Sequence, residues 1–198
     1  VALSSVIVNV DTNSSSCTDE KFRATILKTH TELTLEDLDG ITEIGWGVFA
    51  NCQELVNVEL PSTLTEIGNN AFFNCVKLAS IRIPKSVTYI GFDAFEQCGS
   101  VESIVVEEGG GDGKYWSSGN CLMEYNLVRR GCKNSVIPNT TEVDRIGPNA
   151  VDRVTGLPSV FNIPSNIIYI GPEAFSYASG VDYFDFRSAT SVCRLNEE

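Results

Sequence analysis

Identical residues return along this chain at a fixed interval of 23 positions. The interval separates the members of three columns, which are Gly45, Gly68 and Gly91; Phe49, Phe72 and Phe95; and Cys52, Cys75 and Cys98. Apolar residues between the columns share the pattern L-x-x-V-x-L, or one close to it, in 55–60, 78–83 and 101–106. A unit this short cannot bury its own apolar edge, so copies must stack. The repeat therefore predicts a solenoid in which each turn, called a rung below, is one copy.

The residues within one copy predict the path of a rung. Alternation in x-I-x-I-P predicts a short strand with one face inward, ended by a proline such as Pro84 that cannot donate to a ladder. The T-x-I-G segment of Thr65–Gly68 turns the chain along the opposite side, and we expect a short helical turn over 71–75 before the next strand. Looser copies around Ile146 and Ile170 extend the pattern. We expect about seven rungs between residues 31 and 198.

Residues 1–30 are expected to cap the first rung. The apolar stretch 1–10 predicts a strand, and Thr18-Asp19-Glu20 predicts the start of an amphipathic helix that runs to about Lys28. Solenoids need such covers on their terminal repeats.

Residues 107–135 do not fit a rung. EEGGGDG predicts a turn-rich loop, and CLMEYNLVRRGC predicts a short hairpin around Tyr125-Asn126. Two interpretations stay open. The segment is either a protruding element that contacts a ligand through Tyr115, Trp116, Arg129 and Arg130, or a bulged rung that pads the stack.

The repeat resembles the BspA-type leucine-rich repeats of bacterial surface proteins, whose units read approximately L-x-x-I-x-I-P-x-x-V-T-x-I-G-x-x-A-F-x-x-C. The resemblance covers roughly Thr31 to Phe186. It implies a strand-rich α/β fold, namely a right-handed solenoid with a parallel sheet on its concave side and short helical turns and short strands on its convex side. It also implies an extracellular or cell-surface binding module, not an enzyme. Because the chain does not begin with Met, we expect any signal peptide or anchor to lie outside this segment.

The Cys and Phe columns are predicted to be core. Ala178 stands at the cysteine position of the last rung, so a small buried apolar residue suffices there, and free buried thiols are favoured over disulfides or a metal site. Cys121 and Cys132 flank the predicted hairpin and could pair, whereas Cys17 and Cys193 have no assigned state. The predicted core residues are Cys52, Cys75, Cys98, Phe49, Phe72, Phe95 and Phe175.

No residue set selects an enzyme or a cofactor. The only histidine, His30, has no nucleophile motif beside it, and EEGGGDGK lacks the ending of a phosphate-binding loop. The adjacent carboxylates Glu107 and Glu108 are interpreted as solvated. A net charge of −12 argues against nucleic acid and against anionic membranes as partners, and no apolar run is long enough to insert into a membrane.

A binding role must therefore lie on the surface. Outward strand positions are expected to form one concave row of about seven strands, roughly 30 Å across at about 4.8 Å per strand. The row holds few aromatic anchors, and its residues are Thr34, Asn57, Glu59, Ser80, Arg82, Ser103, Val105, Tyr183 and Asp185. With Trp116 and Arg129 these are the candidate ligand-binding residues of an adhesion module for a protein or glycan. The alternative is a structural spacer in a larger surface or phage-tail-like protein.

Overall fold

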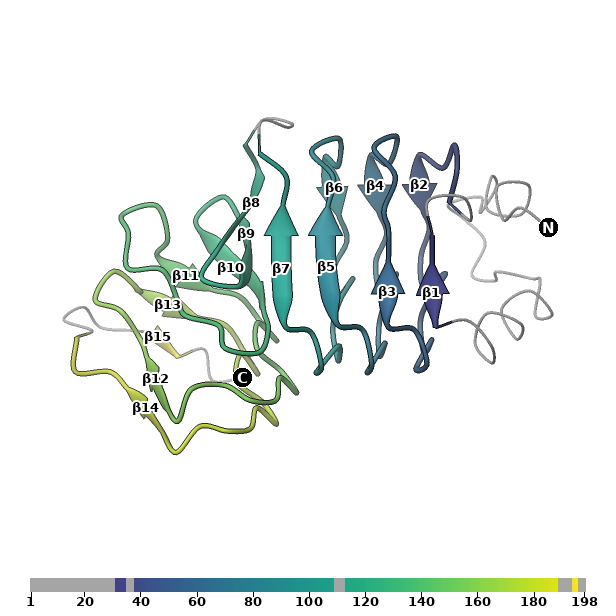
Figure 1. Ribbon diagram of the computed structural model, residues 1–198. Helices are drawn as coiled ribbons and strands as arrows, with labels where there is room; N and C mark the ends of the chain where they lie inside the picture. Colours follow the sequence, from purple (N-terminus) through teal and green to yellow (C-terminus); the bar gives the residue numbers. More distant parts are fainter. Residues whose placement is uncertain (1–30, 35–37, 109–112, 189–193, 196–198) are drawn as a thin grey trace.

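A computed structural model describes residues 31–34, 38–108, 113–188 and 194–195, and within them all regular structure is β-strand (Figure 1). The predicted cap at 1–30 lies outside the described residues. The strands are β1 (Glu32–Leu33), β2 (Glu43–Ile44), β3 (Asn57–Val58), β4 (Glu66–Ile67), β5 (Ser80–Ile83), β6 (Tyr89–Ile90), β7 (Ser103–Val106), β8 (Tyr115–Ser118), β9 (Cys121–Glu124), β10 (Leu127–Gly131), β11 (Arg145–Ile146), β12 (Val160–Asn162), β13 (Tyr169–Ile170), β14 (Tyr183–Asp185) and β15 (Arg194–Leu195).

The first three repeats form a regular stack with two strand faces. On the broad face, β1 pairs with β3 and β5 with β7, all parallel, and the Ala79 N–H donates to Val56 O to join the two pairs. These four strands stand side by side in Figure 1. On the narrow face, β2, β4 and β6 form a parallel sheet in which Ile44, Ile67 and Ile90 are in register. The predicted solenoid, with a parallel strand array along one side, is confirmed. We call the rungs from β1 to β7 the first stack.

The predicted helical turns over segments such as 71–75 are wrong. Asn70 and Asn74 have φ values of 55° and 58°, so a left-handed residue stands on each side of 71–73 and interrupts a helix. The backbone instead bonds between rungs: the Phe72 N–H donates to Ala94 O at 2.8 Å and the Asn74 N–H to Glu96 O at 2.9 Å. The third side of the rung is therefore a pair of turns stacked in the manner of strands.

Identical side chains in the first stack form ladders in the core. The rings of Phe49 and Phe72 stack at 5.2 Å between centroids, and those of Phe72 and Phe95 at 5.5 Å. Cys52, Cys75 and Cys98 are buried and free, as predicted. The Cys75 thiol donates to Phe49 O at 3.2 Å and the Cys98 thiol to Phe72 O at 3.1 Å, a hydrogen-bonding role that the repeat did not predict.

The interruption contains the predicted hairpin. β9 and β10 are antiparallel around Tyr125-Asn126, and β8 adds to the outer edge of β9. The hairpin is a wall inside the solenoid, because Leu122 belongs to the core of the first stack whereas Met123 and Val128 belong to a second core. It therefore separates two hydrophobic cores.

Beyond the hairpin, residues 132–188 and 194–195 form a second stack of rungs. β10 pairs in parallel with β11, and β11, β13 and β15 continue the narrow-face arrangement as part of a six-stranded sheet. β12 and β14 form a separate parallel pair in the second stack. Here Phe161, Phe175 and Phe184 meet edge-on or tilted, with centroids 4.7–5.8 Å apart. Phe175 is half-buried and packs against this second core, in keeping with its predicted core position.

Candidate interaction surfaces

The broad face of the first stack carries a groove. Alternation along β3 and β5 turns Val58 and Ile81 away from solvent and exposes the residues between them. Parallel pairing then places equivalent outward positions of successive rungs beside one another. The groove has a volume of about 560 Å³, and its lining residues are Glu32, Thr34, Asn57, Val58, Glu59, Leu60, Ser80, Arg82, Pro84 and Glu107. Five residues of the predicted row, Thr34, Asn57, Glu59, Ser80 and Arg82, therefore lie together.

Two polar pairs organise the groove. The Arg82 Nε donates to Glu107 Oε1 at 3.0 Å, and the Asn57 amide donates to Glu32 Oε1 at 3.4 Å. The Arg82 side chain remains 69% exposed, so its ion pair stabilises the fold by only about 0–1 kcal/mol and leaves the guanidinium available to a partner. Glu107, interpreted from the sequence as merely solvated, is thus part of the surface. Its place one strand away from Arg82 follows from the parallel register and not from its local sequence.

The remaining row residues are divided between the two stacks. Ser103 and Val105 stand opposite Ser80 and Arg82 on β7, at the border of the groove. Tyr183 and Asp185 lie on β14, in a different sheet of the second stack. Hydrogen bonds from Arg187 lower the pKa of Asp185 to about 2, so this carboxylate is already engaged. The expected single row of seven strands is therefore not formed, because the hairpin stands between β7 and β12 (Figure 1).

Trp116 on β8 and Arg129 on β10, both candidate ligand-binding residues, make internal contacts. The Trp116 indole N–H donates to Tyr125 O at 2.9 Å, and its half-buried ring packs against the second core. Arg129 donates to Glu124 and, through Nη2, to Gly91 O at 3.0 Å. Arg129 thus ties the hairpin to the last narrow-face rung of the first stack.

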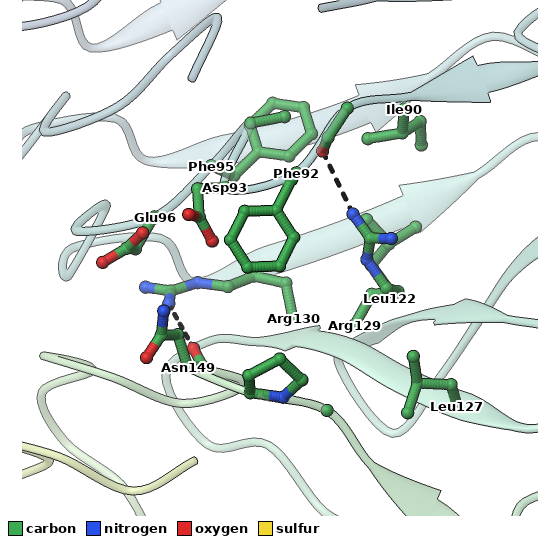
Figure 2. Close-up of a pocket in the computed structure, with 14 residues that line it drawn as sticks. Ile90, Phe92, Asp93, Phe95, Glu96, Leu122, Leu127, Arg129, Arg130 and Asn149 are labelled. Atoms are coloured by element: carbon green, nitrogen blue, oxygen red, sulfur yellow. Dashed lines mark hydrogen bonds between the residues drawn. The ribbon is translucent and has the colours of Figure 1, made fainter. Parts of the chain in front are cut away.

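Arg130 follows Arg129 in the chain and closes the junction between the stacks. In the first stack, Ala94 O and Glu96 O accept N–H groups from the preceding rung. At the corresponding positions beyond the hairpin, Ala150 O accepts the Gly131 N–H at 2.7 Å and Asp152 O accepts Arg130 Nη2 at 3.0 Å. The guanidinium, on a residue only 6% exposed, also donates to Asn149 O (Figure 2). A side chain therefore replaces part of the missing rung.

The other chemical candidates carry no site in the described part of the chain. Cys121 and Cys132 are buried and free, and burial raises their pKa values to about 12 and about 11. Such thiols stay protonated and unreactive at neutral pH. His30, Cys17 and Cys193 lie outside the described residues. Among those residues, no group of three or more His, Cys, Asp or Glu side chains is placed to hold a metal ion, and no helix could cross a membrane.

Comparison with a family model gives a match over most of the sequence. The model for the BspA type leucine-rich repeat region matches residues 16–115 and 125–196 in six copies, where the pattern predicted about seven rungs. The gap between the two matched ranges includes the N-terminal part of the hairpin. No curated protein matches the sequence.

Solved structures of two bacterial proteins are similar. A leucine-rich cell surface protein of Faecalibacterium prausnitzii is 29% identical, with a TM-score of 0.57 over 67% of this chain and 36% of that one. The pneumococcal vaccine antigen PcpA is 19% identical, with a TM-score of 0.61 over 82% of this chain and 38% of that one. The chain thus spans well under half the length of either protein.

Proposed function

The chain belongs to the BspA-type leucine-rich-repeat family, and from this premise we propose that it is a protein-binding module of a bacterial cell surface. The partner binds through the groove over β1, β3, β5 and β7. The supporting observation is that outward side chains of successive rungs meet there in one surface of about 560 Å³. The similar protein of Faecalibacterium prausnitzii is a cell surface protein, which supports the proposed location.

The charge of the groove indicates the class of partner. The groove is lined by one guanidinium, that of Arg82, and by three glutamates, Glu32, Glu59 and Glu107. The whole chain carries a net charge of −12. A basic segment of a partner protein complements this surface, and the long-range field speeds its association. Aromatic anchors are absent from the lining residues, so we expect binding that weakens steeply as salt screens the charges.

Charge reversal in the groove tests the proposal once a partner has been isolated by pull-down with the intact chain. Glu59→Arg and Arg82→Glu should each weaken binding, because each inverts a charge that the partner contacts. Both positions are exposed, so the free energy of unfolding should change by less than about 0.5 kcal/mol. The measurements are surface plasmon resonance at two salt concentrations and chemical denaturation.

Glu66→Arg is the matched control, because Glu66 is an exposed glutamate on β4 of the narrow face. Equal weakening by this control would indicate a nonspecific charge effect. If binding survives both groove substitutions, the groove is not the site. If no partner is found, the chain is better described as a structural spacer in a larger surface protein.

A further inference from the structure

A small cavity lies at the junction of the two stacks, away from the groove. It has a volume of about 110 Å³ between the last turn of the first stack and the residues that follow β11. Leu122, Leu127 and Pro148 supply apolar walls. Phe92, Asp93, Glu96, Arg130 and Asn149 face a common space in Figure 2. The cavity exists because the hairpin replaces a rung and holds the neighbouring rungs apart.

The Phe92 ring is exposed at the edge of the cavity. It is 54% exposed and stands at the same repeat position as Trp46, which is 57% exposed, two rungs earlier. Phe92 borders the cavity, with polar groups on the other side, and Trp46 is not among the residues that line it. An exposed aromatic face opposite a few convergent polar groups is typical of a small-molecule site.

The polar side of the cavity holds groups of both signs. Asp93 and Glu96 line it together with the Arg130 guanidinium and Asn149, and burial raises the pKa of both carboxyl groups. Arg130 is only 6% exposed, while Arg129 is paired with Glu124. Because carboxyl and guanidinium groups face the same space, a neutral polar ligand fits this site better than an ion of either sign.

We propose that this cavity binds the terminal residue of a neutral glycan. A sugar ring presents C–H groups on one face, which would stack on Phe92, and hydroxyl groups at its rim. Those hydroxyls both donate and accept hydrogen bonds, so they can pair with the Asp93 and Glu96 carboxyl oxygens and with the Asn149 amide opposite. The cavity is far smaller than the roughly 300 Å³ at the lower end of ordinary small-molecule sites, so only the last residue enters and the rest of the glycan stays in solvent.

Titration with sugars followed by NMR chemical shifts tests the proposal on the intact chain. The probes are the methyl glycosides of glucose, galactose, mannose and N-acetylglucosamine, with N-acetylneuraminic acid and glucuronic acid as charged comparisons. At least one neutral glycoside should shift the signals of Phe92 and of the Arg130 guanidinium with a dissociation constant below about 10 mM. If none does so, or if the acidic sugars bind more tightly, the proposal is wrong.

Two variants assign the binding to the cavity. Phe92→Ala and Asn149→Gly should each weaken it at least about tenfold. Glycine suits position 149 because Asn149 has a φ of 53°, and it keeps the carbonyl that Arg130 contacts. Trp46→Ala removes an equally exposed ring away from the cavity and should leave the affinity unchanged.

Unchanged binding in both cavity variants, or equal loss in Trp46→Ala, would overturn the assignment. A circular dichroism melt of each variant checks that it folds, and Phe92→Tyr, which keeps the aromatic face, should retain binding. The groove variant Glu59→Arg should bind sugar normally, so failure of the groove proposal and failure of this one are distinguishable.

Discussion

The two stacks solve the same packing problem in different ways. In the first stack the strand position of each rung holds Val58, Ile81 or Ile104, and the turn position always holds Phe. The rings then stack on their own copies at interplanar angles of 21° and 7°. In the second stack the strand positions hold Phe161 and Phe184, the first turn position holds Val151, and the rings meet at 49–69°.

The difference shows what strict repetition contributes. When the same residue occupies a column, each rung offers its neighbour the same surface, and a ladder forms. The Val151 side chain is smaller than the phenylalanine that holds this position in the first stack. A phenylalanine ring from the strand side fills the core there instead. The first stack buries all three rings and places Phe72 between two identical neighbours, whereas in the second stack Phe161 is buried and Phe175 and Phe184 are half-buried.

The largest effect is expected where a ring is enclosed on both sides. Phe72→Ala removes a side chain that is 1% exposed and stacked between Phe49 and Phe95. It should lower the free energy of unfolding by roughly 3–5 kcal/mol. Phe175→Ala, at the half-buried equivalent of the second stack, should cost less. Urea denaturation of both variants measures the difference, and equal costs would mean that the ladder adds nothing to ordinary burial.

The cysteine ladder should tolerate loss better than growth. Cys75→Leu adds volume in a column closed above and below by other thiols, and should cost on the order of 1–3 kcal/mol. Cys75→Ala loses only the thiol bond to Phe49 O and should cost about 1 kcal/mol. Because the neighbouring Cys98 thiol and burial raise the pKa of Cys75, the ladder thiols should not react with a thiol reagent in the native protein until denaturant is added. Rapid native labelling of Cys52, Cys75 or Cys98, or a disulfide among them in the mass spectrum, would contradict this assignment.

The junction and the second stack should respond to pH in opposite directions. Burial raises the pKa of Asp93, so its protonated form favours the folded state. That contribution is complete below the unfolded value, near about 4, and is lost as pH rises through the folded pKa. Asp185 has a lowered pKa of about 2, so its contribution exists above about pH 4 and is lost as pH falls toward 2.

Asp93→Asn tests the direction in which the junction's contribution to stability changes with pH. Compared with the parent protein, the variant should lose less stability between about pH 4 and pH 7, by less than about 1 kcal/mol because solvent screens a half-exposed group. Denaturation curves at several pH values measure it. Asp185→Asn serves as the control and should leave the slope above pH 5 unchanged; a change there would indicate a general charge effect.

The regular part of the fold could be predicted because the repeat expresses it many times. The Phe and Cys columns, the strand faces and the hairpin around Tyr125-Asn126 all follow from spacing and alternation. The helical turns did not follow, although a signal was present: Gly47, Asn70, Asp93 and Asn149 occupy one column, and all four have positive φ values. Residues of these types tolerate the left-handed region, and their recurrence indicated turns more strongly than the short A-F-x-x-C segment indicated a helix.

The candidate surfaces were predictable only in part. The outward row from Thr34 to Arg82 follows from the alternation of side chains along each strand. This alternation can be recognised in the sequence without knowing the neighbouring rungs. Glu107 joins Arg82, and Phe92 faces Asn149, across distances of 25 and 57 positions in the chain. Such pairs depend on where the hairpin inserts and how far it separates the rungs.

The sequence by itself determined that the chain stacks short rungs, which residues face inward, and that its surface is acidic, because periodicity and charge are properties of every copy. Only the tertiary structure decided that the hairpin enters the core, that Arg130 replaces missing backbone donors, and that the strand row is divided in two. The physical reason is that a repeat specifies contacts between equivalent positions. A break in the repeat brings together residues that have no equivalent, and their contacts arise from three-dimensional packing alone.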